Sequence, residues 1–281
     1  MDICLIMDNP ETPNHPVIGV ALHKLSARHT VRLLDVHQLT AAQAITQAEA
    51  HLPASIYLLK SHAPQALALA HHLEQRGALV VNSWASSMAC QDRALMAQRM
   101  REAGLPWPRT WNFPTLEHLL SQDDLLATLP FPLIIKSYYS HRGDLVDKMY
   151  TVGQLQALAQ EWRQEPVILQ EFAHGDGWDI KLWVIDAHIF AARRRTPLEA
   201  NAPKEDHPIS EEDLPKAWRQ IALEIGHAFD LRLYGVDLLM TGGGPMVVDV
   251  NSFPGFRGVP GADDALVALV ERLVEERQTA L

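Results

Sequence analysis

Short apolar runs separated by amphipathic stretches dominate the first eighty residues. The runs expected to form strands are Asp2–Met7, His29–Val36, Ala54–Leu59 and Ala78–Val81. Between them, helical composition is found in Ile18–Ser26 and Pro64–Arg76. Strands that alternate with helices of about 10–15 residues are typical of a parallel sheet with helical crossovers. We therefore expect an α/β unit with a parallel sheet at the start of the chain.

The rest of the chain combines helices with strands that follow one another directly. Expected helices are Met88–Ala103, Val152–Arg163, Lys216–Phe229 and Ala265–Arg277. Expected strands are Pro132–Lys136, Val167–Glu171, the hairpin-like stretch Asp179–Ala192, Tyr234–Met240 and Pro245–Asn251. The segment Thr196–Pro215 is polar, acidic and proline-containing, which predicts a long loop of the kind that often forms a lid.

Length and composition restrict the classes of protein. A chain of 281 residues exceeds the usual domain length of about 100–200 residues, so two lobes or a subdivided unit are expected. The hydrophobic share of 47% is ordinary for a globular protein, and no run approaches the length of a membrane span. The start of the chain has no basic region before its apolar run and indicates a strand, not a signal peptide. The two distant cysteines, Cys4 and Cys90, fit a reducing cytoplasm.

The net charge of −10 argues against nucleic-acid binding as the main function. A local basic cluster could still hold a small anionic ligand. The 14 histidines have no spacing typical of metal ligands, and the pair His71-His72 is expected on an exposed helix face.

Three oxygen-bearing side chains stand out near the C-terminal end. Asp249 and Asn251 are two residues apart on one expected strand and so project from the same face, and Asp237 lies on the preceding strand. Such a set suits a hard cation such as Mg²⁺. The alternative is a hairpin with solvated acids, but the apolar neighbours indicate burial, and buried carboxylates need a partner.

Several weaker signals point to a nucleotide. Lys136 closes an apolar strand and could reach a phosphate, and the polar loop Ser137–Asp147 after it could cover the phosphates. Glu171 and Phe172 end a strand that could face a purine ring. The run Arg193–Arg195 is either a solvated basic face or the source of a guanidinium for a phosphoryl group.

The order of these motifs resembles the ATP-grasp superfamily, and within it the RimK-type glutamate ligases and the related amino-adipate ligase of lysine biosynthesis. The resemblance extends over about residues 82–277. It rests on Gln91-Asp92-Arg93, Ile134-Ile135-Lys136, Gln170-Glu171-Phe172, Asp179-Ile180-Lys181, Ala191-Ala192 with Arg195, Gly235-Val236-Asp237, and Asp249-x-Asn251-x-x-Pro254-Gly255. The last of these is the most specific.

The resemblance implies an ATP-grasp fold, in which two α+β lobes enclose ATP behind an N-terminal parallel-sheet domain. The expected division is 1–84 for the N-terminal domain, 85–118 for a connecting region, 119–190 for the small lobe and 191–281 for the large lobe with the metal site. It also implies residue roles: Arg93 and Lys136 at the phosphates, Glu171, Phe172 and Ala173 at adenine, Asp179 at the ribose, Arg195 as the catalytic residue at the γ-phosphate, and Asp237, Asp249 and Asn251 at two Mg²⁺ ions, with Mn²⁺ as an alternative.

The sequence departs from the family pattern at several positions. Arg93 replaces a lysine, Asp249 replaces a glutamate, and Lys181 replaces an arginine. The segment Thr196–Pro215 contains Asn201 but no glycine pair, and the loop Ser137–Asp147 is poor in glycine.

The implied activity is that of a cytoplasmic ATP-dependent carboxylate–amine ligase that works through an acyl-phosphate and releases ADP and phosphate. Its substrates would be ATP, a carboxylate and an amino-acid amine, with a small molecule, peptide or carrier protein as acceptor, in a homodimer or homotetramer. His141, Arg142 and Arg257 could recognise an acidic substrate or could be ordinary surface residues. One alternative is a kinase of a small polyol, like the inositol phosphate kinases, and another is a non-catalytic ATP-binding protein. The net charge disfavours the first, and the intact acidic set disfavours the second.

Overall fold

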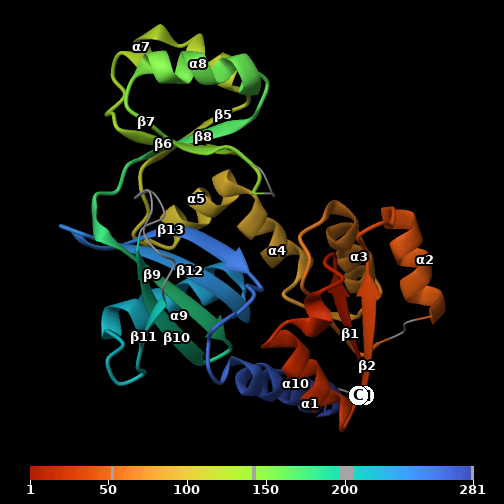
Figure 1. The fold of residues 1–281 in the computed structure, drawn as a ribbon. Helices are drawn as coiled ribbons and strands as arrows, with labels where there is room; N and C mark the ends of the chain where they lie inside the picture. The colour runs from red at the N-terminus through yellow and green to blue at the C-terminus, as the bar shows by residue number, and fades with distance from the viewer. Residues whose placement is uncertain (52–53, 141–143, 196–205, 280–281) are drawn as a thin grey trace.

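The computed structural model describes residues 1–51, 54–140, 144–195 and 206–279, which are arranged around three sheets (Figure 1). The first sheet is parallel, with the order β2-β1-β3-β4. Its strands are β1 (Asp2–Met7), β2 (Thr30–Asp35), β3 (Ile56–Leu59) and β4 (Leu79–Val81). The parallel α/β unit expected from the first eighty residues is thus confirmed.

Helices cover both faces of this parallel sheet. Ile3 and Leu5 of β1 pack in one core with α1 (Ile18–Ser26) and α10 (Ala262–Thr279), whereas Cys4 and Ile6 face α2 (Ala41–His51) and α3 (Pro64–Gln75). A short 3-10 helix, η1 (Thr12–Asn14), precedes α1. The sequence pattern did not predict α2. The C-terminal helix α10 therefore returns to the N-terminal unit and ties the two ends of the chain together.

The second sheet forms the upper lobe of Figure 1 and is antiparallel, in the order β5-β8-β6-β7. Its strands are β5 (Thr110–Phe113), β6 (Leu133–Ser137), β7 (Val146–Met149) and β8 (Val167–Glu171). One face is covered by α6 (Leu116–Leu120), α7 (Asp123–Leu126) and α8 (Val152–Trp162), which share its apolar core. The opposite face of this sheet is turned toward the third sheet.

The third sheet is antiparallel and has five strands in the order β11-β10-β9-β12-β13. They are β9 (Gly175–Ile185), β10 (His188–Arg195), β11 (Asp206–Ile209), β12 (Leu233–Thr241) and β13 (Gly244–Ser252). One face packs against α4 (Trp84–Gln91), α5 (Arg93–Glu102) and α9 (Lys216–Phe229). Among the described residues, no helix is long and apolar enough to cross a membrane.

Two local predictions need correction. The loop expected over Thr196–Pro215 contains strand β11, because Asp206–Ile209 pairs with β10 and so forms the edge of the five-stranded sheet. The single helix expected over Met88–Ala103 is divided in two at Asp92, whose backbone is extended. The Asp92 carboxylate accepts hydrogen bonds from the Ala94 and Leu95 amides at 3.0 and 2.8 Å, so it caps the N-terminus of a new helix.

Strand pairing also moves the expected lobe boundaries. The small lobe was expected to span 119–190, but β5 joins its sheet from before that range. Strand β9, which falls inside the range, pairs with β10 and β12 in the five-stranded sheet. The chain therefore passes from one lobe to the other between β8 and β9, at about residues 172–174.

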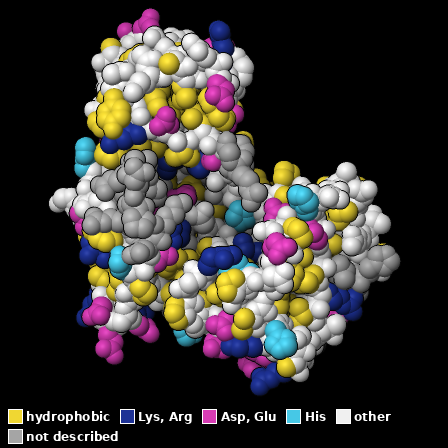
Figure 2. Space-filling model, in the orientation of Figure 1, with side chains coloured by type: hydrophobic (Ala, Val, Ile, Leu, Met, Phe, Trp, Pro, Cys, Tyr) yellow, Lys and Arg dark blue, Asp and Glu magenta, His cyan; other side chains and the backbone are white. Residues whose placement is uncertain are grey.

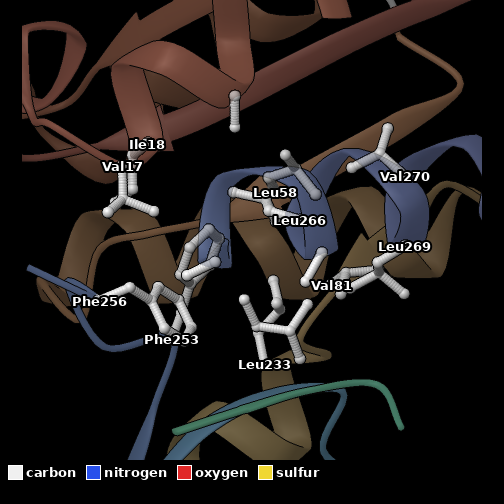
Figure 3. Close-up of a cluster of buried hydrophobic side chains, with 14 of the residues drawn as sticks. Val17, Ile18, Leu58, Val81, Leu233, Phe253, Phe256, Leu266, Leu269 and Val270 are labelled. Carbon is white, nitrogen blue, oxygen red and sulfur yellow. The ribbon is translucent and has the colours of Figure 1, made fainter. Parts of the chain in front are cut away.

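The N-terminal unit is joined to the five-stranded sheet by a shared apolar core (Figure 3). Leu58 and Val81 from the parallel sheet, Leu233 at the start of β12 and the aromatic rings of Phe253 and Phe256 meet there. Both rings are only 1% exposed. Because this core draws on segments from both ends of the chain, it fixes the position of the loop that follows β13.

Asn82 is a polar connection within this junction. Its side chain is 2% exposed and accepts hydrogen bonds from the Arg232 and Leu233 amides at 2.8 and 3.0 Å. It also donates to the Leu233 carbonyl at 2.6 Å. These three bonds satisfy the backbone at the start of β12, where a buried amide without a partner would be costly.

We predict that Asn82→Ala lowers the free energy of unfolding by about 3 kcal/mol, because two backbone amides and a carbonyl lose a buried partner. Urea unfolding monitored by circular dichroism would measure the change. Asn112→Ala on the exposed side of β5 is the matched control and should change stability by less than about 0.5 kcal/mol. Equal effects of the two substitutions would contradict the assigned role of Asn82.

Candidate active site

A cleft of about 270 Å³ lies between the antiparallel four-stranded sheet (β5-β8-β6-β7) and the five-stranded sheet. Its walls are mainly apolar, with a few charged groups. The lining residues are Pro108, Ile134, Lys136, Val146, Asp147, Gln170, Glu171, Phe172, Ala173, Asp179, Leu239 and Val248. Five of the residues predicted to bind the nucleotide are among them: Lys136, Glu171, Phe172, Ala173 and Asp179. Sequence segments more than 100 residues apart thus converge on one enclosed space.

The connection between β8 and β9 forms one wall of the cleft. The Phe172 ring packs edge-on against His174, with 4.8 Å between the ring centroids. The ammonium of Lys148 on β7 lies 3.4 Å from the centroid of the Phe172 ring. Cation–π contact of this kind orients the ring. Lys148 was not predicted, because a lysine on a short strand of the small lobe carries no distinctive sequence signal.

Alternation along the strands places the acidic residues on the face of the five-stranded sheet opposite its helices. Asp237 on β12 is paired in register with Asp249 on β13 and with Lys181 on β9. Asn251 follows Asp249 by two residues and therefore shares its face. The next position along this face of β9 is Asp179, which lines the cleft.

The Asp237 carboxylate has an opposite charge on one side and a like charge on the other. Its Oδ1 lies 2.5 Å from the Lys181 ammonium. Burial raises the pKa of Asp237, Lys181 lowers it, and Asp249 raises it again. Two carboxylates directly across an antiparallel pair repel each other, so this face favours a bound cation.

Lys136 reaches from the small lobe to the large one. Its Nζ donates a hydrogen bond of 3.2 Å to the Val248 carbonyl on β13. Burial lowers the pKa of Lys136, whereas the nearby Asp249 raises it. The ammonium therefore lies at the boundary between the apolar cleft and the acidic face, where it can meet an anion that occupies both.

Arg93 lies beside this site but does not line the cleft. Its guanidinium donates to the Ser137 carbonyl at 2.8 Å and forms an ion pair of 2.6 Å with Asp144. The side chain is buried, and its Nε has no hydrogen-bond partner among the described residues. Arg93 therefore braces both ends of the β6–β7 connection, and its contact with a nucleotide stays a prediction.

The arginine run on β10 is divided by strand alternation. Arg194 is in register with Asp179, and Arg195 is in register with Trp178. Arg194 thus belongs to the face that carries Asp179, and it forms a two-point ion pair with Asp206 at 2.5 and 2.8 Å. The side chain of Arg195 lies outside the described residues, as do His141, Arg142 and Asn201. The catalytic role of Arg195 stays a prediction.

The donor atoms on the acidic face fit a divalent cation that also binds phosphate. Asp237 and Asp249 supply carboxylate oxygens, and the Asn251 amide donates to Asp249 at 3.1 Å, which leaves its carbonyl oxygen as a third donor. Within the described ranges, no cluster of three or more His, Cys, Asp and Glu side chains is arranged for a metal. Mg²⁺ commonly uses only one or two carboxylates and completes its shell with water and phosphate, so two acids and an amide suffice.

Fold and site together define the class of protein. The chain superposes on a RimK-domain ATP-grasp protein from Sphaerobacter thermophilus with a TM-score of 0.74 and 20% identity, covering 96% of this chain and 100% of that one. It superposes on the D-alanine–D-alanine ligase of Bacillus anthracis in complex with ATP with a TM-score of 0.73 and 19% identity, covering 100% and 98% of the two chains. The expected ATP-grasp fold is confirmed.

The family follows from the sequence. The model of the RimK-like ATP-grasp domain matches residues 109–269, and the chain belongs to this family. A probable alpha-L-glutamate ligase of Shewanella loihica is 27% identical over 217 residues, which are 75% of this chain and 71% of that protein. A protein of the same name from Vibrio vulnificus is 27% identical over 207 residues, 72% and 68% of the two chains. The chain is thus an ATP-dependent, ADP-forming ligase that joins a carboxylate to an amine.

We predict that Lys136→Met raises the dissociation constant for Mg·ATP by about tenfold or more, because one charge-assisted contact to phosphate is lost while the apolar stem is kept. Isothermal titration calorimetry would measure it. Lys216→Met at the exposed start of α9 removes the same charge away from the cleft and should leave the affinity unchanged. An unaltered affinity of Lys136→Met would exclude the phosphate role.

Proposed function

We propose that the cleft between the two sheets holds ATP, with the base in its apolar part and the phosphates at the acidic face. The observation that carries this proposal is the position of Lys136. Its side chain lines the apolar cleft, and its ammonium donates a hydrogen bond to the Val248 carbonyl, next to Asp249. An apolar slot that leads to a lysine and paired carboxylates suits a flat heterocycle joined to a metal-bound polyphosphate.

In this arrangement Phe172, Ala173 and the end of β8 contact the base. The backbone of this connection and the Phe172 ring, held by Lys148, form a wall against which a purine can stack. Glu171 and Asp179 also line the cleft, and ribose hydroxyls can donate hydrogen bonds to their carboxylates. Gln170, which also lines the cleft, is buried and donates a hydrogen bond to Thr110, which holds its side chain in the wall.

Asp237, Asp249 and Asn251 would hold Mg²⁺ ions at the phosphates. A metal held there would supply positive charge that offsets the negative charge developing on the phosphate. Lys136 adds a second positive charge from the small lobe. Lys181 neutralises Asp237 and so restrains the repulsion between the two acids.

The reaction needs two displacements. A substrate carboxylate oxygen attacks the γ-phosphorus, the bond to the leaving ADP oxygen breaks, and an acyl-phosphate forms. The amine nitrogen then attacks the acyl carbon, phosphate leaves, and the amine loses a proton to give an amide. Negative charge accumulates on the phosphoryl oxygens in the first step. Lys136, and Arg194 on the sheet face that carries Asp179, would supply the positive charges that stabilise it.

The amine is proposed to be an α-amino acid. The two curated relatives are named as probable alpha-L-glutamate ligases, which makes L-glutamate the first substrate to test. The acceptor carboxylate, whether on a small molecule, a peptide or a carrier protein, and a homo-oligomeric state remain predictions. No observation favours phosphorylation of a hydroxyl over ligation.

The ligase activity is tested by incubating the full chain with Mg·ATP and a panel of amino acids and dipeptides. The members of the panel are added singly and in every combination of two. We expect phosphate release that depends on the amino acid, together with a product whose mass equals the sum of two substrates minus water. Malachite-green detection and mass spectrometry measure the two quantities on one sample. A phosphorylated alcohol, or phosphate release without a condensed product under every condition, would contradict the proposal.

We predict that Asp249→Ala and Asn251→Ala each reduce turnover by at least about 100-fold, because a developing phosphoryl charge loses its metal-mediated neutralisation. Circular dichroism and the thermal midpoint should show an intact fold. Asp124→Ala on the exposed surface of α7 removes a carboxylate elsewhere and should retain full activity. Turnover close to that of the control would reject the metal assignment.

A further inference from the structure

The parallel sheet has a topological switch point that faces the active site. In the order β2-β1-β3-β4, the chain moves to one side of β1 for β2 and to the other side for β3 and β4. Ligands of open α/β sheets bind in the crevice beyond the carboxyl ends of the strands at such a point. Asp8 directly follows β1, and Lys60 directly follows β3. Both residues therefore flank this crevice.

Lys60 is a partly buried cation without a close counter-ion. Its Nζ lies 5.5 Å from the centroid of the Phe253 ring. Within the described part of the chain, no carboxylate lies within ion-pair distance of it. Burial lowers the pKa of Lys60, and Asp8 opposes this only through the longer-range charge interaction. Holding a lysine here is costly unless an anion joins it.

The turn after β13 supplies a second cation. Phe253 and Phe256 have φ values of 45° and 56°, a left-handed conformation that is unfavourable for residues with a side chain. Their rings are buried in the junction core of Figure 3, which holds the backbone in this shape. Arg257 comes immediately afterwards. It is exposed, and no ion pair or hydrogen bond of its side chain is found among the described residues.

His15 completes the group as a neutral donor. Its Nδ1 accepts from the Val17 and Ile18 amides at 3.2 and 3.3 Å, which places the proton on Nε2. A Cβ atom on Gly255 would lie 3.3 Å from that Nε2, so the ring edge faces the turn. Burial lowers the pKa of His15, and the charges of Arg257 and Lys60 lower it further. Lys60 lies at Phe253, the His15 ring lies at Gly255, and Arg257 follows two residues later, so all three residues border the same turn.

Two cations between α10 and the five-stranded sheet are paired, which sets Lys60 and Arg257 apart. Arg232 lies 3.9 Å from Glu276, and Arg272 forms an ion pair with Asp186. Figure 2 shows dark blue and cyan side chains close together where the N-terminal unit meets the five-stranded sheet, with magenta side chains to one side of them. A positive surface in a chain of net charge −10 marks a site for an anion.

The crevice is connected to the acidic face through the end of β13. Asn251 is followed by Ser252, whose carbonyl accepts a hydrogen bond of 2.9 Å from His62, two residues after Lys60. The His62 Nδ1 is also bonded to Gln91 at 2.5 Å, next to the start of α5. The segment that carries Lys60 is therefore hydrogen-bonded to the residue that directly follows Asn251, one of the proposed metal ligands.

We propose that Lys60, Arg257 and the Nε2–H of His15 form a subsite for a non-reacting carboxylate of the small-molecule substrate. This inference rests on the proposed ligase function and extends it to substrate selection. The two cations bind the carboxylate by charge, and His15 donates one hydrogen bond. Asp8 at the opposite edge disfavours a second anion and accepts an ammonium group. A substrate with an additional carboxylate is therefore preferred over its amide.

The test measures binding separately from turnover. L-Glutamate, L-aspartate and their amides L-glutamine and L-asparagine are titrated by calorimetry into the full chain saturated with Mg·ADP. The same titrations use Arg257→Gln, Lys60→Gln and, as the matched control, Arg101→Gln at the exposed end of α5. Arg257→Lys tests rescue by charge. Mg·ADP affinity and the thermal midpoint of each variant are measured in parallel.

We expect an acidic amino acid to bind the wild type at least about tenfold more tightly than its amide, and Arg257→Gln and Lys60→Gln to remove this preference. Arg257→Lys should restore part of it, and Mg·ADP affinity should not change in any variant. Equal affinity for acid and amide, or an acid preference kept by both glutamine variants, would overturn the subsite. If Lys60→Gln is unstable, the exposed Arg257→Gln decides.

Failure of the ligase proposal has a different signature. In that case the acid preference and its loss in Arg257→Gln would still be measured by calorimetry, whereas no condensed product would form with any substrate pair. Conversely, amide-bond formation with an acidic amino acid at undiminished kcat/KM in Lys60→Gln and Arg257→Gln would leave the ligase standing and exclude the carboxylate subsite.

Discussion

The pairing of β12 with β13 is the interaction on which the active site depends. Antiparallel register places Asp237 directly opposite Asp249, a juxtaposition of like charges that the protein opposes with Lys181 on one side and Lys136 on the other. Burial raises the pKa of Asp237 and strengthens the need for a cation. A site with this charge balance is suited to a substrate that brings both phosphate and metal.

The second constraint is the junction core between the N-terminal unit and the five-stranded sheet. Phe253 and Phe256 are buried there with a left-handed backbone, and Asn82 satisfies the start of β12. These contacts fix the loop beyond the proposed metal ligands against the switch point of the parallel sheet. The proposed nucleotide site and the proposed substrate subsite thus use different sheets, and the junction core holds these sheets in a fixed relative position. Coupling a phosphoryl transfer to an acyl transfer requires such fixed positioning of the reactants.

Local patterns predicted much of this molecule, and their failures have physical causes. The strands around Lys136, Glu171, Asp237 and Asp249 were found because each is a short apolar run with a polar end. Strand β11 was missed because its four residues gain their structure only by pairing with β10. The break at Asp92 was missed because Met88–Ala103 is uniformly helical in composition. Only the structure shows that the Asp92 carboxylate caps the N-terminus of α5.

The sequence by itself determined the parallel unit, the acidic set Asp237, Asp249 and Asn251, and the family, because period-two alternation and motif order are local properties of the chain. Tertiary structure alone decided that Arg194 shares a sheet face with Asp179, that Lys148 lies over Phe172, and that Lys60 lies near the ring of Phe253. Each of these depends on strand register or on packing between residues that are 15 to nearly 200 positions apart. Such relations are set by the global fold and leave no periodic signal in the chain.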